Sequence, residues 1–101
     1  MKFKVIYIAL VKEDLKKATH YYKNISLRLA KYFIFRIRGA KEYIARNPYG
    51  DDVMYKEIRM HNIRRFPYHI HYQILEDKKQ ILILAIEFSK RDNLDFSSRE
   101  R

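Results

Sequence analysis

Residues 63–74 read IRRFPYHIHYQI, and this stretch decides the fold. After two arginines, large apolar side chains alternate with polar or smaller ones, a period of two that is typical of a β-strand with two different surfaces. The apolar set, which we expect to face the core beneath helices, consists of Phe66, Tyr68, Ile70, Tyr72 and Ile74. The opposite face of the strand is predicted to carry Arg65, Pro67, His69, His71 and Gln73.

Two amphipathic helices are predicted before this strand. Apolar residues recur every three or four positions, first in Val11, Leu15, Ala18, Tyr22 and Ile25, and then in Ala30, Phe33, Ile37, Ala40 and Ile44. Ser26 is a suitable N-cap for the second helix. The pair Asn47-Pro48 ends that helix, because the residue before a proline avoids helical backbone angles. The short connection indicates a helical hairpin.

Four strands complete the pattern. Residues 3–10 and 53–59 are rich in β-branched and aromatic side chains, and residues 64–75 contain all of the opening stretch except its first residue. Residues 60–62 are expected to connect the second strand to the third. Residues 81–88, ILILAIEF, are typical of a central strand buried on both faces. The order β-α-α-β-β-β predicts an α+β fold, a mostly antiparallel sheet with the helical hairpin packed on one face.

The composition limits the class of protein. The chain has 101 residues, of which 48% are hydrophobic, so we expect one domain at residues 1–92 and a polar tail at 93–101 that frays. Cysteine is absent, which excludes disulfides and thiolate zinc sites. The apolar run at residues 5–11 is too short to span a bilayer, so a cytoplasmic protein that does not engage a membrane is expected.

The formal charge of +10 is concentrated in the first half of the chain. Residues 1–50 hold twelve Lys and Arg against three acids, whereas residues 51–101 hold ten against nine. Such a protein usually meets a polyanion, although the charge can also serve solubility alone. The cations on and beside the strands suit anion recognition, or cross-strand pairing with Glu57 and Glu87. They are Lys56, Arg59, Arg64, Arg65, Lys90 and Arg91.

The sheet face away from the helices is the predicted binding surface. On the second strand, Met54, Ile58 and Met60 are assigned to the helix side, which leaves Arg59 on the outer side. Ile81 and Ile83 are an even number of residues away from Glu87, so an undistorted strand points all three side chains to the same face. The two isoleucines are therefore assigned to an outer apolar strip, which a partner is expected to cover. The full predicted contact set for a target or partner is Arg59, Arg64, Arg65, His69, His71, Ile81, Ile83, Lys90 and Arg91.

His69 and His71 have the spacing at which two imidazoles on one strand can bind one metal ion. Such a site needs a third ligand, for which Glu57 and Glu87 are candidates, and supporting partners. The remaining histidines are assigned elsewhere, so we predict no metal and no cofactor. A phosphate-cradling glycine loop and a nucleophile elbow are absent as well.

Four segments carry a resemblance to a known family: EDL…A…YY in residues 13–22, LA…F…I…A…I…NP in 29–48, IR…RFPY.I.Y.I in 58–74 and I.I.AI…S.R in 81–91. Their order and spacing resemble the RelE/ParE toxin superfamily of type II toxin–antitoxin modules. The resemblance implies a toxin that is neutralised by a cognate antitoxin, a segment of which wraps it. It also implies one of two targets, since ParE-like members inhibit DNA gyrase and RelE-like members cut mRNA in the ribosome.

The RFPY strand resembles ParE-like toxins of the plasmid-stabilisation type, so gyrase is the expected target. RelE-like toxins resemble one another in second-strand lysines, a third-strand arginine, and an arginine plus a tyrosine after the last strand. Here Lys56 is the only second-strand lysine, His69 takes the arginine position, and no tyrosine follows the last strand. For a ribosome-dependent endoribonuclease, the resemblance leaves a site of His69, His71, Arg65, Arg91 and Lys56. A third alternative is an inactive member that retains only antitoxin binding.

Overall fold

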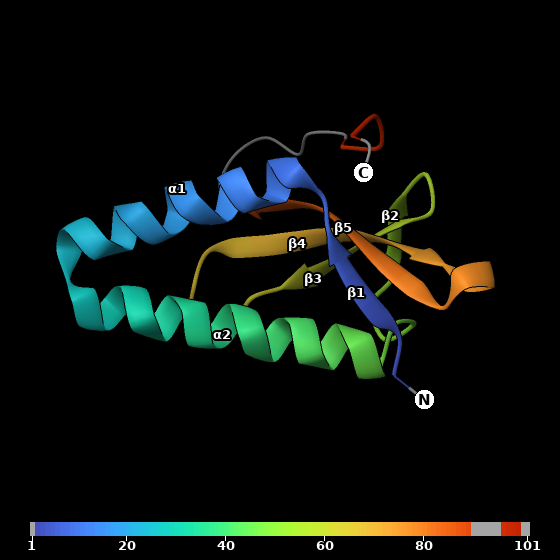
Figure 1. Cartoon of the computed structure of the whole chain (residues 1–101), viewed down its shortest axis with the longest axis horizontal. Coiled ribbons are helices and arrows are strands. Elements are labelled where there is room, and N and C mark those ends of the chain that lie inside the picture. The colour runs from blue at the N-terminus through green and yellow to red at the C-terminus, as the bar shows by residue number, and fades with distance from the viewer. Residues whose placement is uncertain (1, 90–95, 100–101) are drawn as a thin grey trace.

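The computed structural model describes residues 2–89 and 96–99, in which two helices lie on one face of a five-stranded sheet (Figure 1). In chain order the elements are β1 (Lys4–Tyr7), α1 (Ala9–Ile25), α2 (Leu27–Arg46), β2 (Val53–Tyr55), β3 (Ile58–Asn62), β4 (Tyr68–Leu75), the 3₁₀ turn η1 (Glu76–Lys78) and β5 (Gln80–Phe88). The strand order is β1-β5-β4-β3-β2, with β1 parallel to β5 and the other pairs antiparallel. The predicted α+β fold with a helical hairpin is confirmed.

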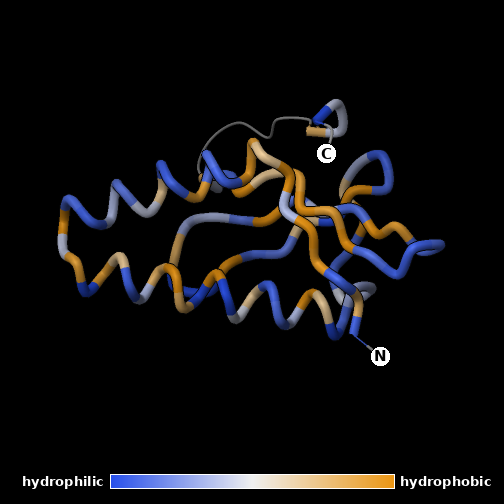
Figure 2. Tube along the Cα trace, in the orientation of Figure 1, coloured by the Kyte–Doolittle hydropathy of each residue, from blue (hydrophilic) through white to orange (hydrophobic). Residues whose placement is uncertain are grey.

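The helical hairpin forms where the apolar periodicity places it. Ser26 separates the helices, and its hydroxyl accepts a hydrogen bond from the Leu29 amide at 3.0 Å, so it is the predicted N-cap. α2 ends at Arg46, just before the Asn47-Pro48 pair. The two apolar stripes are buried in the main core. Apolar residues recur along both helices as orange segments in Figure 2. Their buried members are Val11, Ala18, Tyr22, Ala30, Phe33, Ile37, Ala40 and Ile44.

Aromatic rings fill the space between the hairpin and the sheet. The centroids of Tyr22 and Phe33 lie 5.0 Å apart, and that of Phe66 lies 5.0 Å from Tyr22 and 5.1 Å from Phe33. Tyr68 joins them at 5.4 Å from Phe33. Buried aromatic side chains contribute roughly 1.5–3 kcal/mol each, so this cluster anchors the hairpin on β4. The predicted orientation of the opening stretch is therefore right.

The second predicted strand is in fact two strands joined by a tight turn. Tyr55 pairs with Ile58, so Lys56 and Glu57 form a two-residue hairpin loop, with φ angles of 41° and 65°. Residues 60–62, expected as a connection, are part of β3. The prediction was wrong because this loop lacks the Asn-Gly or Asp-Gly pair that normally marks such a turn.

A bulge in β5 overturns the predicted apolar strip. His71 pairs with Ala85 but Tyr72 pairs with Ile83, so Leu84 is the extra residue. One extra residue exchanges the two faces of the sheet for all side chains in the part of the strand before it. Ile81 and Ile83 therefore turn to the helix side, where they are 0% and 1% exposed and belong to the main core.

The assignment of Arg59 to the outer face was also wrong. Arg59 pairs with Tyr72 in the sheet, and paired residues share a face, so it lies on the helix side. There its guanidinium donates to the Asp51 carbonyl and stacks over the Tyr49 ring, 5.3 Å from the ring centroid. Met60, opposite His71, is on the outer face instead.

Candidate functional site

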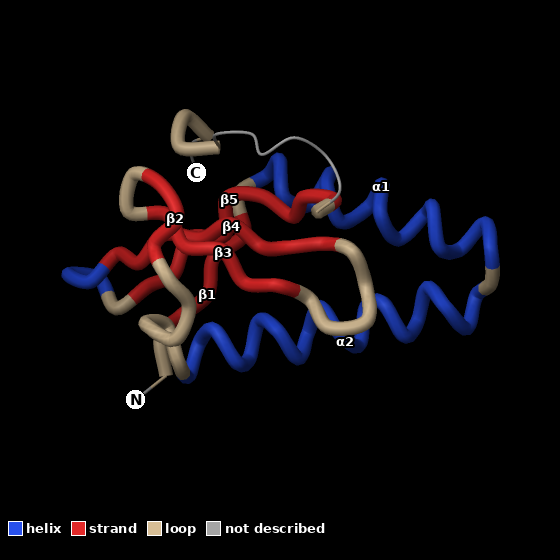
Figure 3. Tube along the Cα trace, turned by 180° about the vertical axis from the view of Figure 1, so that it is seen from behind, coloured by secondary structure: helices blue, strands red, loops and turns tan. Residues whose placement is uncertain are grey.

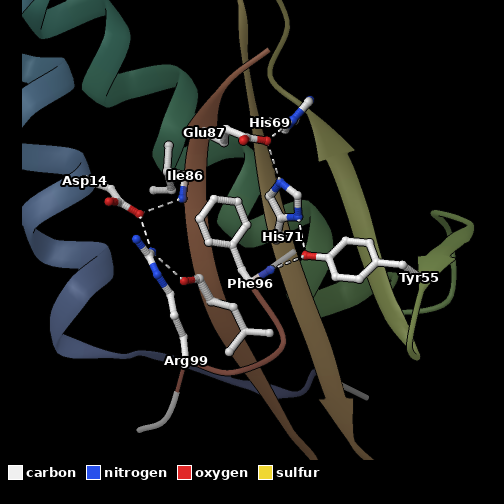
Figure 4. A network of polar contacts seen from close by, with 9 residues as sticks. Asp14, Tyr55, His69, His71, Ile86, Glu87, Phe96 and Arg99 are labelled. Atoms are coloured by element: carbon white, nitrogen blue, oxygen red, sulfur yellow. Dashed lines mark hydrogen bonds and ion pairs between the residues drawn. The ribbon is translucent and has the colours of Figure 1, made fainter. Parts of the chain in front are cut away.

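Three polar side chains meet on the sheet face away from the helices, the side turned to the viewer in Figure 3. His69 and His71 lie two residues apart on β4, and Glu87 on β5 is directly opposite His69. The Oε1 atom of Glu87 lies 2.9 Å from the Nε2 of His69 and 3.0 Å from the Nε2 of His71 (Figure 4). All three residues are buried, His71 completely.

Hydrogen bonds fix the proton positions in this cluster. A carboxylate oxygen only accepts, so beside an ionised Glu87 both Nε2 atoms are donors. The Nδ1 of a neutral His71 is then an acceptor, and the Tyr55 hydroxyl, 2.8 Å away, donates to it. Burial lowers the pKa of His71 below its ordinary value, against the opposing effect of the Glu87 carboxylate. The ring is accordingly neutral at neutral pH.

The last described residues cover His71. The Phe96 ring lies 4.7 Å from the imidazole, centroid to centroid, and the Phe96 amide donates to the Tyr55 oxygen at 3.2 Å. Arg99 donates to the Asp14 carboxylate at 2.8 Å and thereby ties this segment to α1 (Figure 4). Phe96 and Arg99 belong to the tail that was expected to fray, yet both pack against the sheet.

The remaining predicted site residues lie elsewhere. Arg64 and Arg65 are exposed in the loop between β3 and β4, and Arg65 has a φ of 77°. Lys56 is exposed in the β2–β3 turn, at the opposite end of β3. The first and last Cα atoms of a five-residue strand are separated by roughly 13 Å. Lys90 and Arg91 fall outside the described residues.

A basic groove of about 550 Å³ lies between the two helices beside β1. No acidic residue is among the described side chains that line it. Lys41 lies over the Tyr7 ring, 5.3 Å from its centroid. The groove gathers much of the positive charge of the first half of the chain, in Lys12, Lys16, Lys23, Arg38 and Lys41.

Sequence reasoning missed four residues of the buried cluster and its cover: Asp14, Tyr55, Phe96 and Arg99. Their partners lie far along the chain, 72 residues away for Asp14 and Ile86, and no local pattern indicates such a contact. Phe96 alone carried a signal, because it is a large apolar side chain in an otherwise polar tail.

A family model decides the class of this protein. The model of the ParE toxin of the type II toxin–antitoxin system parDE matches residues 5–93. The chain belongs to this family. The resemblance to the RelE/ParE superfamily is thus confirmed, and this ParE-family chain is a toxin of a type II toxin–antitoxin system.

Two solved structures share the fold of this ParE-family chain. One is a toxin–antitoxin complex, RelBE2 from Mycobacterium tuberculosis, with 17% identity, a TM-score of 0.60, and coverage of 87% of this chain and 99% of that chain. The other is a mutant of the E. coli toxin RelE in the free state, with 9% identity, a TM-score of 0.64, and coverage of 89% and 86%. A comparison with curated proteins gives no match. Within the described residues, neither helix is long and apolar enough to cross a membrane.

Proposed function

We propose that this ParE-family toxin inhibits DNA gyrase by binding it, without nuclease chemistry, and that a cognate antitoxin neutralises it. The observation that carries the proposal is the burial of His69 and His71, the second of which lies beneath the Phe96 ring. Cleavage of RNA through the 2′-OH requires a base and an acid within hydrogen-bond reach of the substrate. Both histidines instead hydrogen-bond to a protein carboxylate.

The positions of the cations named for a nuclease site also disfavour nuclease chemistry. Stabilisation of a phosphorane requires positive groups that converge on one phosphate. Lys56 and Arg65 lie in the loops beyond opposite ends of β3, so the fold places them apart and does not gather them at one point. A toxin that acts by binding needs no such convergence, and exposed Arg64 and Arg65 then serve as contact residues for the target.

The antitoxin is proposed to place an acidic segment along the basic groove between α1 and α2. Five cations line this groove, and no acid does among its described residues, so a segment of opposite charge is complementary. The solved Mycobacterium tuberculosis relative is itself a toxin–antitoxin complex, which supports a partner of this kind.

The experiment is induction of the chain in growing bacteria with parallel labelling of DNA and protein. A gyrase inhibitor reduces thymidine incorporation before methionine incorporation, because translation continues until transcripts are lost. The matched control is the chain co-induced with its cognate antitoxin, which should restore both rates. An immediate fall in methionine incorporation would indicate the ribosome-dependent nuclease, and unchanged growth would indicate an inactive member; either result contradicts the proposal.

A further inference from the structure

We propose that His69, His71 and Glu87 form a binding site for one Zn²⁺ ion. Each residue offers one ligand atom, and these atoms lie within 4.8 Å of one another. Two imidazoles and a carboxylate are the donor set of many three-ligand zinc sites, and zinc accepts nitrogen and oxygen donors in tetrahedral geometry. The site lies beyond the toxin activity proposed above and does not depend on it.

The distances between donors fit an ion of this size. Bonds of about 2.0–2.1 Å in a tetrahedral site place neighbouring donor atoms roughly 3.3 Å apart. In the hydrogen-bonded cluster the Glu87 oxygen lies 2.9 Å from one Nε2 and 3.0 Å from the other. The ion replaces the two Nε2 protons, and each Nε2 atom then needs to move away from the Glu87 oxygen by only a few tenths of an ångström. Such a shift is within the reach of side-chain rotation.

The backbone presets the three donors. Residues i and i+2 of a strand point to the same face, so β4 directs both imidazoles outward. The register then places Glu87 opposite His69 on the neighbouring strand. A Zn²⁺ ion at this point would link the two central antiparallel strands of the sheet.

Two further observations point to a cation. Among residues 2–89 and 96–99, the buried Oε2 atom of Glu87 has no hydrogen-bond partner, although a buried, unpaired carboxylate oxygen is costly. The Nδ1 of His71 is 2.8 Å from the Tyr55 hydroxyl, the kind of outer partner that orients a zinc-bound imidazole. When the metal takes the Nε2 position, the proton moves to Nδ1 and the Tyr55 oxygen accepts it.

A cavity reaches one of the three proposed ligands, Glu87. A cavity of about 450 Å³ is lined by Glu87 and by the covering residues Phe96 and Arg99. Zinc sites with three protein ligands keep water in the fourth position. Neither histidine is among the described lining residues, so that water would reach the ion on its Glu87 side.

The test uses the full chain, without an affinity tag and stripped with a chelator, titrated with Zn²⁺ in a calorimeter. The wild-type chain is expected to bind one ion, and Co²⁺ in its place should give visible absorption of a tetrahedral site. Glu87→Gln and His69→Asn should each weaken Zn²⁺ binding at least tenfold, and Tyr55→Phe by about tenfold. The control is His20→Asn, an exposed histidine on α1 that should not change the affinity.

Thermal unfolding provides the second readout and guards against misfolded variants. Saturating Zn²⁺ should raise the melting temperature of the wild-type chain and of His20→Asn, but not that of either ligand variant. Each variant is compared only if its metal-free circular dichroism spectrum matches the wild type, and His69→Asn serves if Glu87→Gln does not fold. The proposal is overturned if the wild-type chain takes up no Zn²⁺, or if a folded ligand variant binds it as tightly as the wild type. The cluster is then a hydrogen-bond network alone.

Discussion

The carboxylate of Asp14 on α1 accepts a hydrogen bond from the backbone amide of Ile86, at 3.1 Å, on the half of β5 that β1 does not pair. Beside it, Arg99 donates to the Leu84 carbonyl at 2.9 Å. An unpaired strand edge is a template for association with other chains. Here two side chains occupy the backbone groups of that edge and tie it to the first helix and the last described segment.

Loss of the Asp14 carboxylate should therefore destabilise the fold. Asp14→Ala leaves the amide of buried Ile86 without a partner, at a cost of about 1–3 kcal/mol in the free energy of unfolding. Urea denaturation measures the difference. Lys17→Ala is the control, because this exposed residue lies on the same helix and, like Asp14, lines the cavity beside Glu87. It should change the free energy of unfolding by less than about 0.5 kcal/mol. Equal effects of the two changes would refute this role of Asp14.

The turn between β2 and β3 can be improved. Lys56 and Glu57 both have positive φ angles, which cost energy for side chains other than glycine and asparagine. Replacing the pair with Asn and Gly should stabilise the chain by roughly 1 kcal/mol, measured as a higher melting temperature. The control is the same replacement at Asp77 and Lys78, where φ is not positive and no gain is expected. A gain at both positions would contradict the assignment of the turn.

Alkaline pH should destabilise the protein through Tyr72. Burial raises the pKa of this phenol above its ordinary value of 10.0, and Asp51, which accepts its hydrogen bond, raises it further. Above pH 10 the unfolded chain loses this proton while the folded chain keeps it, so the free energy of unfolding decreases by up to about 1.4 kcal/mol per pH unit. Below pH 10 both states are protonated and the residue adds no pH dependence.

The comparison is between the wild-type chain and Tyr72→Phe, by urea denaturation between pH 9 and 11. The variant is less stable throughout, since it lacks the hydrogen bonds to Pro48 and Asp51, but its free energy of unfolding should depend less steeply on pH. Parallel profiles would show that Tyr72 does not stay protonated in the folded state.

The bulge at Leu84 makes a further prediction about β5. Because it turns Ile83 into the core, Ile83→Ala should cost about 2–5 kcal/mol in the free energy of unfolding. Val53→Ala removes methyl groups from a strand residue that is 50% exposed, and should have a much smaller effect. A small loss of stability in Ile83→Ala would indicate that Ile83 lies on the outer face, as the alternation of the sequence had predicted.

Long periodic segments were predictable from the sequence because their signal is local. Two helical stripes, the Ser26 cap and the alternation of residues 66–74 each depend on side chains a few positions apart. The failures arose where one residue changes the register. The turn at Lys56 lacks the usual turn residues. The bulge at Leu84 lies within the apolar residues 81–86, and the polar Glu87 that marks a face comes after the bulge.

The candidate site was predictable only in part. Strand parity places His69 and His71 on one face away from the helices, but it does not show what covers them. The cover comes from Phe96 and Arg99, and its anchor from Asp14 at the other end of the chain. Contacts of this kind depend on the tertiary fold. That cover changes the interpretation of the histidines, from surface contacts to buried groups that suit a metal ion.

Inhibition of gyrase by binding is measured in a supercoiling assay with purified gyrase, relaxed plasmid and ATP. The free chain should inhibit supercoiling in a dose-dependent manner. Arg64→Glu with Arg65→Glu, both exposed, should reduce that inhibition, whereas the control Lys78→Glu, exposed on η1, should not. Supercoiling that proceeds at the full rate with a large excess of the folded chain would contradict the account.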